Sequence, residues 1–140
     1  MNLSCIGLVG YGEVGKIFAA GLRPQSGVST VAAWDRQFAQ PDRRDAERAH
    51  ARAAGVHACD SLADLCARST LVISAVTASN TLAVAEEAAA HLRPGSLFLD
   101  LNSASPGTKQ QCAALVESRG AEYVEAGVMT SVPPYGIRVP

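Results

Sequence analysis

Residues 5–16, C-I-G-L-V-G-Y-G-E-V-G-K, are the stretch around which the rest of the chain is organised. Ile6, Leu8 and Val9 are typical of a strand buried on both faces of a parallel sheet, because such strands are nearly continuous apolar runs. Residues 17–22, I-F-A-A-G-L, suit a helix that packs on that sheet. The stretch therefore predicts a strand, a tight glycine-rich turn and a helix.

The turn, G-Y-G-E-V-G at residues 10–15, has the G-x-G-x-x-G spacing of the dinucleotide-binding fingerprint. In that fingerprint Gly10 makes the tight turn, Gly12 lets the backbone approach a pyrophosphate, and Gly15 lets helix and strand pack closely. The second half of the fingerprint is an acid about 20 residues further on. Asp35 comes 20 residues after Gly15 and directly follows a strand-like run, V-A-A-W. Together the two halves predict a nucleotide cofactor, with an ordinary turn acid as the alternative for Asp35.

A second nucleotide-binding pattern overlaps the same residues. G-Y-G-E-V-G-K nearly satisfies the P-loop pattern G-x-x-x-x-G-K-[ST], and L-F-L-D at residues 97–100 resembles the strand and acid that accompany it. The P-loop needs a hydroxyl after its lysine to hold magnesium, and Ile17 cannot ligate a cation. A P-loop nucleotide-binding protein is therefore the remote alternative, and Lys16 is expected to be a solvated helix residue.

The composition argues against several classes of partner. The chain has 12 basic and 13 acidic residues and a net charge of −1, which does not favour nucleic acid. We expect no membrane span and no signal peptide, because no apolar run reaches ~20 residues and no charged leader precedes one. The four cysteines and three histidines show no zinc-like spacing, which predicts reduced thiols, no metal site and a cytoplasmic protein. Cys5 and Cys112 are expected to be buried.

The remainder of the chain alternates strand and helix signals. We expect strands at residues 31–34, 56–58, 71–76, 96–100, 122–126 and 137–139, and helices at 41–54, 61–67, 81–92 and 106–119. Ser61 and Ser105 are candidate N-caps, and Pro106 suits a first helical position. The alternation predicts an α/β protein: one Rossmann-type domain over residues 1–140, with a doubly wound, mostly parallel sheet.

Loops that leave the carboxyl ends of the strands line the ligand crevice of such a sheet. The strand expected at residues 71–76 ends in Ala75 and Val76, and Thr77 begins the loop that follows. Residues 75–79, which include these three, are therefore a candidate wall of the cofactor site.

Three separated segments resemble the cofactor domain of the β-hydroxyacid dehydrogenase family, which includes 3-hydroxyisobutyrate and 6-phosphogluconate dehydrogenases. The first is I-G-L-V-G-Y-G-E-V-G at residues 6–15. The second is D-L-N-S-A-S-P at residues 100–106, similar to the family's D-x-S-T-x-x-P and D-x-x-N-S variants beside nicotinamide and substrate. The third is E-A-G-V-M-T-S at residues 125–131, in the place of the family's D-A-P-V-S-G-G substrate loop. The segments follow the family's order over nearly the whole chain.

The resemblance implies roles for individual residues. Asp35 would accept hydrogen bonds from both hydroxyls of the adenosine ribose and repel a 2′-phosphate, which favours NAD, whereas Arg36 leaves NADP open. The pyrophosphate would meet the backbone N–H groups of Tyr11, Gly12, Glu13 and Val14. The nicotinamide half of the cofactor would lie near Ala75, Val76, Thr77 and Asn102. The substrate would face Asn102, Ser103, Met129, Thr130 and Ser131, of which the last three replace the family's Ser-Gly-Gly.

The implied reaction is hydride transfer between nicotinamide and a small hydroxyacid, with a lysine as general acid and base. In the family that lysine belongs to a helical second domain, and neither Lys16 nor Lys109 matches its position. We therefore expect the cofactor domain of a longer, homo-oligomeric oxidoreductase, which alone would bind cofactor without turnover. Two alternatives stay open: a non-catalytic nucleotide-sensing module, which fold alone does not separate from an enzyme, and a self-bonded turn at Asn102 and Ser103.

Overall fold

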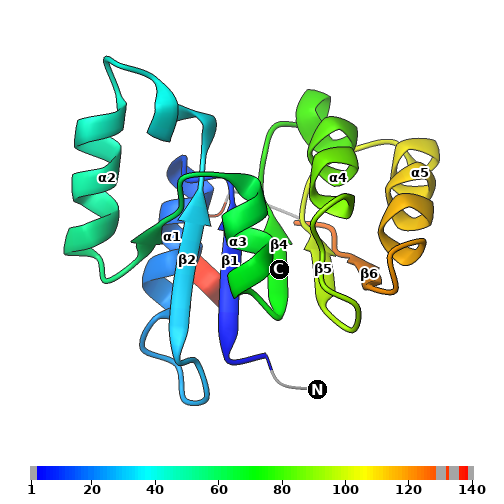
Figure 1. Ribbon diagram of the computed structural model, residues 1–140, viewed down its shortest axis with the longest axis horizontal. Helices are drawn as coiled ribbons and strands as arrows, with labels where there is room; N and C mark the ends of the chain where they lie inside the picture. Colours follow the sequence, from blue (N-terminus) through cyan, green and yellow to red (C-terminus); the bar gives the residue numbers. More distant parts are fainter. Residues whose placement is uncertain (1–2, 129–131, 133–135, 139–140) are drawn as a thin grey trace.

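The computed structural model describes residues 3–128, 132 and 136–138 of the chain. Within these ranges six strands form one parallel sheet in the order β3-β2-β1-β4-β5-β6 (Figure 1). The strands are β1 (Cys5–Val9), β2 (Thr30–Trp34), β3 (His57–Ala58), β4 (Leu71–Ser74), β5 (Leu97–Asp100) and β6 (Glu122–Glu125). The strand order reverses between β1 and β4, which is the topological switch point where doubly wound sheets bind ligands. The predicted fold class is confirmed.

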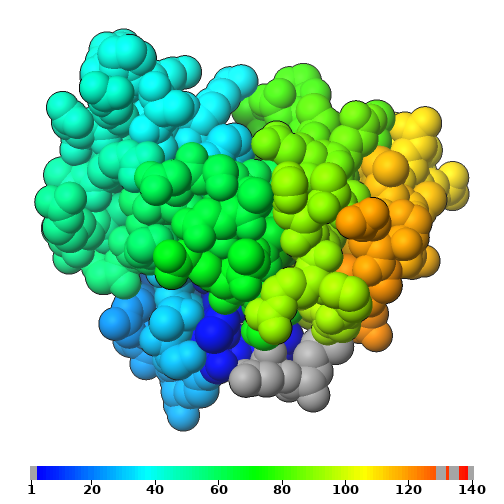
Figure 2. Space-filling view, in the orientation of Figure 1, coloured from blue at the N-terminus to red at the C-terminus, as the bar shows by residue number. Residues whose placement is uncertain are grey.

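Helices cover both faces of this sheet. They are α1 (Glu13–Leu22), α2 (Arg44–Ala53), α3 (Leu62–Arg68), α4 (Thr81–Ala89) and α5 (Pro106–Glu117), with the short 3₁₀ helices η1 (Arg36–Ala39), η2 (Ala78–Asn80) and η3 (Gly136–Arg138). Successive strand residues point to opposite faces. Val72 accordingly packs with residues of α3, α4 and α5, whereas Ile73 packs with residues of α1 and α2. Figure 2 shows the face on which α3, in green, closes over the sheet, so that only a small part of β1, in dark blue, is visible.

Two predicted helix starts are confirmed in detail. The hydroxyl of Ser61 accepts a hydrogen bond from the N–H of Asp64 at the start of α3. The hydroxyl of Ser105 accepts one from the N–H of Thr108, and Pro106 occupies the first turn of α5. These caps satisfy N–H groups that have no partner within the helix.

Several predicted boundaries were wrong. Residues 136–138, where a strand was expected from Ile137, form η3, and Ile137 packs so closely on α1 that a Cβ at Gly21 would lie 2.2 Å from its Cγ2. Val139 lies outside the described residues. Helix α2 begins at Arg44 and not at Pro41, because η1 and a turn occupy residues 36–43. Strand β4 ends at Ser74, which leaves Ala75 and Val76 in the loop.

Candidate cofactor site

A cleft of about 890 Å³ lies at the carboxyl ends of β1, β2, β4 and β5. Its volume falls within the ~300–1,000 Å³ of small-molecule and cofactor sites. The fold brings these predicted residues together in its lining: Gly10, Gly12, Glu13, Val14, Gly15, Asp35, Arg36, Ala75, Val76, Thr77, Asn102 and Ser103. Among the predicted site residues that the structure describes, Tyr11 is absent from the lining. Met129, Thr130 and Ser131 lie outside the described residues.

The three fingerprint glycines differ in what surrounds them. Gly10 has a φ of +104°, and a Cβ there would lie 2.2 Å from the carbonyl oxygen of Ala75. A Cβ at Gly15 would lie 2.0 Å from the carbonyl oxygen of Gly10, so that helix and loop meet backbone to backbone. A Cβ at Gly12 would meet no described atom within 4 Å. Packing within the chain therefore explains why positions 10 and 15 need glycine. Gly12, by contrast, borders open space in the cleft.

The start of α1 offers hydrogen-bond donors to the cleft. The earliest backbone hydrogen bond of this helix runs from the N–H of Lys16 to the carbonyl of Gly12, and Gly12 provides no side-chain cap. Among the residues with a described structure, the N–H groups of residues 12–15 have no acceptor. A helix N-terminus carries partial positive charge, so these donors suit a bound phosphate group.

Asp35 lies at the end of β2 with both carboxylate oxygens engaged. Oδ2 accepts a hydrogen bond of 2.7 Å from the N–H of Tyr11, and Oδ1 accepts one of 2.9 Å from the N–H of Gln37. Each oxygen keeps capacity for a further hydrogen bond, as contact with ribose hydroxyls requires. Asp35 also caps η1. It therefore serves as a turn acid and lines the cleft at the same time. The Tyr11 N–H, expected to face a pyrophosphate, is committed to Asp35 instead.

The side chain of Tyr11 lies beneath the glycine loop. It is buried, its hydroxyl is 2.8 Å from Nδ1 of His50, and its ring packs on Phe38. Burial, with a smaller contribution from the charge of Glu47, raises the pKa of its phenol. Lys16, expected to be solvated, instead forms a 2.9 Å ion pair with Glu47 and does not line the cleft. Tyr11 and Lys16 thus connect the loop and α1 to α2.

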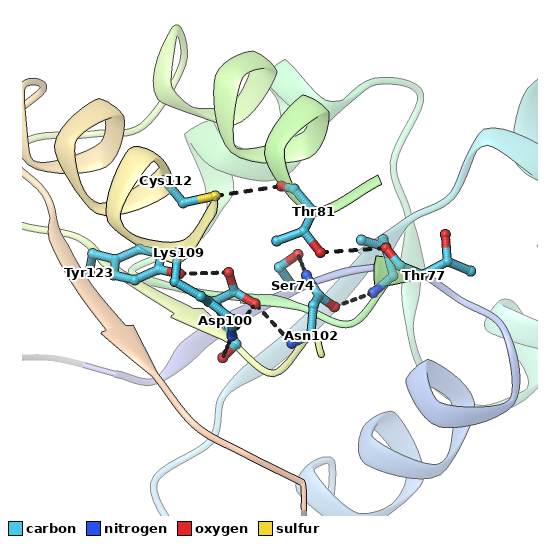
Figure 3. A network of polar contacts seen from close by, with 9 residues as sticks. Ser74, Thr77, Thr81, Asp100, Asn102, Lys109, Cys112 and Tyr123 are labelled. Carbon is cyan, nitrogen blue, oxygen red and sulfur yellow. Dashed lines mark hydrogen bonds and ion pairs between the residues drawn. The ribbon is translucent and has the colours of Figure 1, made fainter. Parts of the chain in front are cut away.

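Asn102 connects the loops that follow β4 and β5 (Figure 3). Its Oδ1 accepts a 2.7 Å hydrogen bond from the N–H of Val76, and its Nδ2 donates a 2.9 Å hydrogen bond to Oγ of Ser74. The amide group is therefore used mainly within the protein, across two strands and not within its own turn. Ser103, next in the chain, is exposed and lines the same cleft.

A buried ion pair lies behind Asn102. Lys109 Nζ is 3.1 Å from Oδ1 of Asp100, and the two residues are 8% and 1% exposed. Lys109 lies on the helix that was predicted to follow Pro106, but nothing in the sequence indicated its pairing with Asp100. Neither residue lines the cleft, so the Lys109 ammonium faces Asp100 and not the cofactor region.

Other lining residues were not among the predicted site residues. They are Val9, Trp34, Gln37, Ala78, Asn80, Ala83, Val84, Glu87, Leu101, Val128 and Val132. The α4 members, Ala83, Val84 and Glu87, are spaced as one helix face. That spacing, together with the loop expected at residues 75–79, was the signal in the sequence from which this part of the lining could have been found.

One cysteine and one histidine that show no zinc-like spacing in the sequence lie close together in the structure, beside an acid. His57, Cys59 and Asp64 place their ligand atoms within 4.8 Å of one another, at the edge of the sheet formed by β3. Asp64 is also 2.9 Å from the guanidinium of Arg68, which opposes a bound cation. Burial raises the pKa of the Cys59 thiol to about 12. Cys112 is buried as predicted, whereas Cys5 is only half-buried.

The glycine loop and the open helix N-terminus at the switch point, together with the acid at the end of β2, define an NAD(P)-binding Rossmann domain. The chain belongs to the family described as the NAD binding domain of 6-phosphogluconate dehydrogenase, whose model matches residues 5–133. Comparison with curated proteins gives no match.

Solved structures share this fold over almost the whole chain. A conserved hypothetical protein from Sinorhizobium meliloti 1021 is 37% identical over 99% of the chain, with a TM-score of 0.91. A 3-hydroxyisobutyrate dehydrogenase from Mycobacterium tuberculosis, solved with L-serine, is 24% identical over 96% of the chain, with a TM-score of 0.81. An imine reductase from Myxococcus stipitatus, solved with NADP+, is 24% identical over 91%, with a TM-score of 0.71. The likeness to the last two shows the fold alone.

The chain spans less than half the length of these solved proteins: 46%, 44% and 42% of them in the same order. Among the described residues, no helix has the length and apolar character needed to cross a membrane. More than half of each of these solved proteins lies outside the match.

Proposed function

We propose that the chain is the cofactor domain of an oxidoreductase that acts on a small hydroxyacid and prefers NAD to NADP. The observation that carries the preference is the position of Asp35, whose carboxylate lies in the cleft at the end of β2. A carboxylate there can accept hydrogen bonds from the adenosine ribose and repels a 2′-phosphate. Arg36 is exposed beside it and would be the residue to favour NADP.

The residues present fit a dinucleotide along the cleft. The open side of Gly12 leaves room for a pyrophosphate, and the N–H groups of residues 12–15 supply donors for it. From there the cleft continues to Val76, Thr77 and Asn102, where the nicotinamide half would lie. Bound nicotinamide would supply hydride chemistry, and the chain's own residues would hold and orient it.

The hydroxyacid substrate is inferred from two sources. The family membership links the chain to 6-phosphogluconate dehydrogenase, and the relative with a TM-score of 0.81 is a 3-hydroxyisobutyrate dehydrogenase. Ser103 adds a hydroxyl at the nicotinamide end of the cleft, where it can hydrogen-bond a hydroxyacid. We assign the general acid and base to a lysine of a helical second domain, because Lys109 is committed to Asp100. A homo-oligomeric, cytoplasmic parent protein completes the proposal, and the four free thiols support the cytoplasm.

Titration calorimetry with NAD, NADP and ATP, with and without magnesium, tests the cofactor assignment. We expect NAD to bind without magnesium and more tightly than NADP. Asp35→Ala should raise the dissociation constant for NAD by at least about tenfold, since hydrogen bonds to a charged group contribute ~1.5–3 kcal/mol each. Asp42→Ala, at an exposed acid outside the cleft, is the matched control and should bind NAD as the wild type does.

Other results would point elsewhere. A preference for NADP would indicate that Arg36, and not Asp35, sets the cofactor preference. Magnesium-dependent binding of ATP would favour the alternative of a P-loop nucleotide-binding protein. The parent reading frame separates an enzyme from a nucleotide sensor. A helical domain with a suitably placed lysine supports the dehydrogenase, whereas a DNA-binding domain contradicts it.

A further inference from the structure

We propose that Lys109 and Tyr123 form a positioning network around the buried carboxylate of Asp100, which holds the nicotinamide end of the cofactor site in shape by fixing Asn102. The inference rests on the proposed function, since it places the nicotinamide half at the loops after β4 and β5. None of the three residues lines the cleft. They would therefore act through Asn102 and not by touching cofactor or substrate.

The centre of this network is the carboxylate of Asp100 at the end of β5. It is 1% exposed and accepts from three donors: Lys109 Nζ at 3.1 Å, the N–H of Asn102 at 2.8 Å and the hydroxyl of Tyr123 at 2.7 Å. Figure 3 shows Lys109 and Tyr123 reaching it from α5 and β6. A buried charge costs several kcal/mol unless it is paired and hydrogen-bonded, so all three donors are held firmly.

Tyr123 remains a donor because of its surroundings. Burial, and next the hydrogen bond to Asp100, raise the pKa of its phenol above the ordinary value. Its ring stacks on Phe98 with the centroids 6.0 Å apart, which anchors it to the neighbouring strand. The hydroxyl therefore fixes one oxygen of Asp100 while Lys109 and Asn102 share the other.

The carboxylate controls the cleft through one residue. By accepting the N–H of Asn102 the Asp100 side chain closes a tight turn over residues 100–102, and this turn sets the direction of the Asn102 side chain. That side chain in turn holds the N–H of Val76 and the hydroxyl of Ser74. The loop at residues 75–77 is thus tied to the loop at 101–103, and both line the part of the cleft assigned to nicotinamide.

A network of this kind need not add stability. Replacing a buried ion pair with apolar residues of similar volume is often neutral or stabilising, whereas removing one partner alone strongly destabilises. A positioning role can therefore be distinguished from a folding role. If the whole network is replaced by apolar side chains, the protein should still fold, but the loops after β4 and β5 should become less well held.

The triple variant Asp100→Leu, Lys109→Met, Tyr123→Phe removes the network without leaving a buried charge. We expect it to fold and to bind NAD about tenfold more weakly, as when the loops are in place in only about one molecule in ten. ADP, which lacks the nicotinamide half, should bind within about twofold of its wild-type affinity. The double variant Asp64→Leu, Arg68→Met removes an exposed ion pair of α3 and is the control. It should bind both NAD and ADP with wild-type affinity.

Equal weakening of NAD and ADP, or no weakening of either, would overturn the proposal. If the wild type binds neither ligand, the cofactor assignment fails while the network is still tested by amide hydrogen exchange. In the triple variant, or in Tyr123→Phe alone if the triple variant does not fold, the N–H of Val76 should exchange faster. The N–H of Ala75, bonded to the carbonyl of Val9 at 2.9 Å, is the internal control and should not change. Unchanged exchange at Val76 would show that Asn102 does not depend on the network.

Discussion

Gly12→Ala should separate cofactor binding from folding in this domain. Gly12 precedes α1 with a φ of −82°, a value that alanine also adopts. The added methyl would meet no described atom of the chain within 4 Å. It would instead enter the cleft at the place where we expect the pyrophosphate to approach the backbone.

The two effects differ in size. Alanine loses less conformational entropy on folding than glycine does, which stabilises by ~0.4–1 kcal/mol, but it is a poorer N-cap by a similar amount. The free energy of unfolding should therefore change by less than about 1 kcal/mol. For binding, displacement of the pyrophosphate should cost at least about 1.4 kcal/mol, which is a tenfold rise in the dissociation constant for NAD.

Calorimetric titration with NAD and urea denaturation of the same preparation measure both quantities. Gly107→Ala is the matched control, because Gly107 also borders open space, lies in the first turn of α5 and is outside the cleft. It should bind NAD as the wild type does. A Gly12→Ala variant that binds NAD within about twofold of wild type would refute the assignment of Gly12 to the pyrophosphate.

Two further predictions concern stability. Gly15→Ala should lower the free energy of unfolding by about 3 kcal/mol or more, because its Cβ would lie 2.0 Å from the backbone oxygen of Gly10; an unchanged urea midpoint would contradict this packing. Burial raises the pKa of Cys59 and of Cys66 to about 12 from 9.0. Above pH 9 the unfolded chain loses these thiol protons while the folded chain keeps them. The free energy of unfolding should therefore fall by about 1.4 kcal/mol per pH unit for each of the two thiols. Urea midpoints at pH 8 and pH 10.5 measure the fall, and Cys66→Ala should reduce it; an equal fall in that variant would assign the pH dependence to other groups.

Much of the fold could be predicted because its signals are local. The glycine spacing, the apolar runs of the strands and the caps at Ser61 and Ser105 each depend on residues within one or two turns of chain. The position of Asp35 followed from the regular length of a strand–helix–strand unit. Element ends were less predictable: β4 stops at Ser74 although the apolar run continues, since Val76 bonds to Asn102 and not to a strand.

By itself the sequence determined the sheet, the glycine loop and the acid at the end of β2, because these follow from periodicity and turn chemistry along the chain. Only the tertiary structure decided how the polar groups pair. Asp35 receives the N–H of Tyr11 from 24 residues away, and Asp100 receives Tyr123 from 23 residues away. Nothing in the spacing encodes such pairs, because buried polar groups take whichever partners the packed elements bring within hydrogen-bond distance.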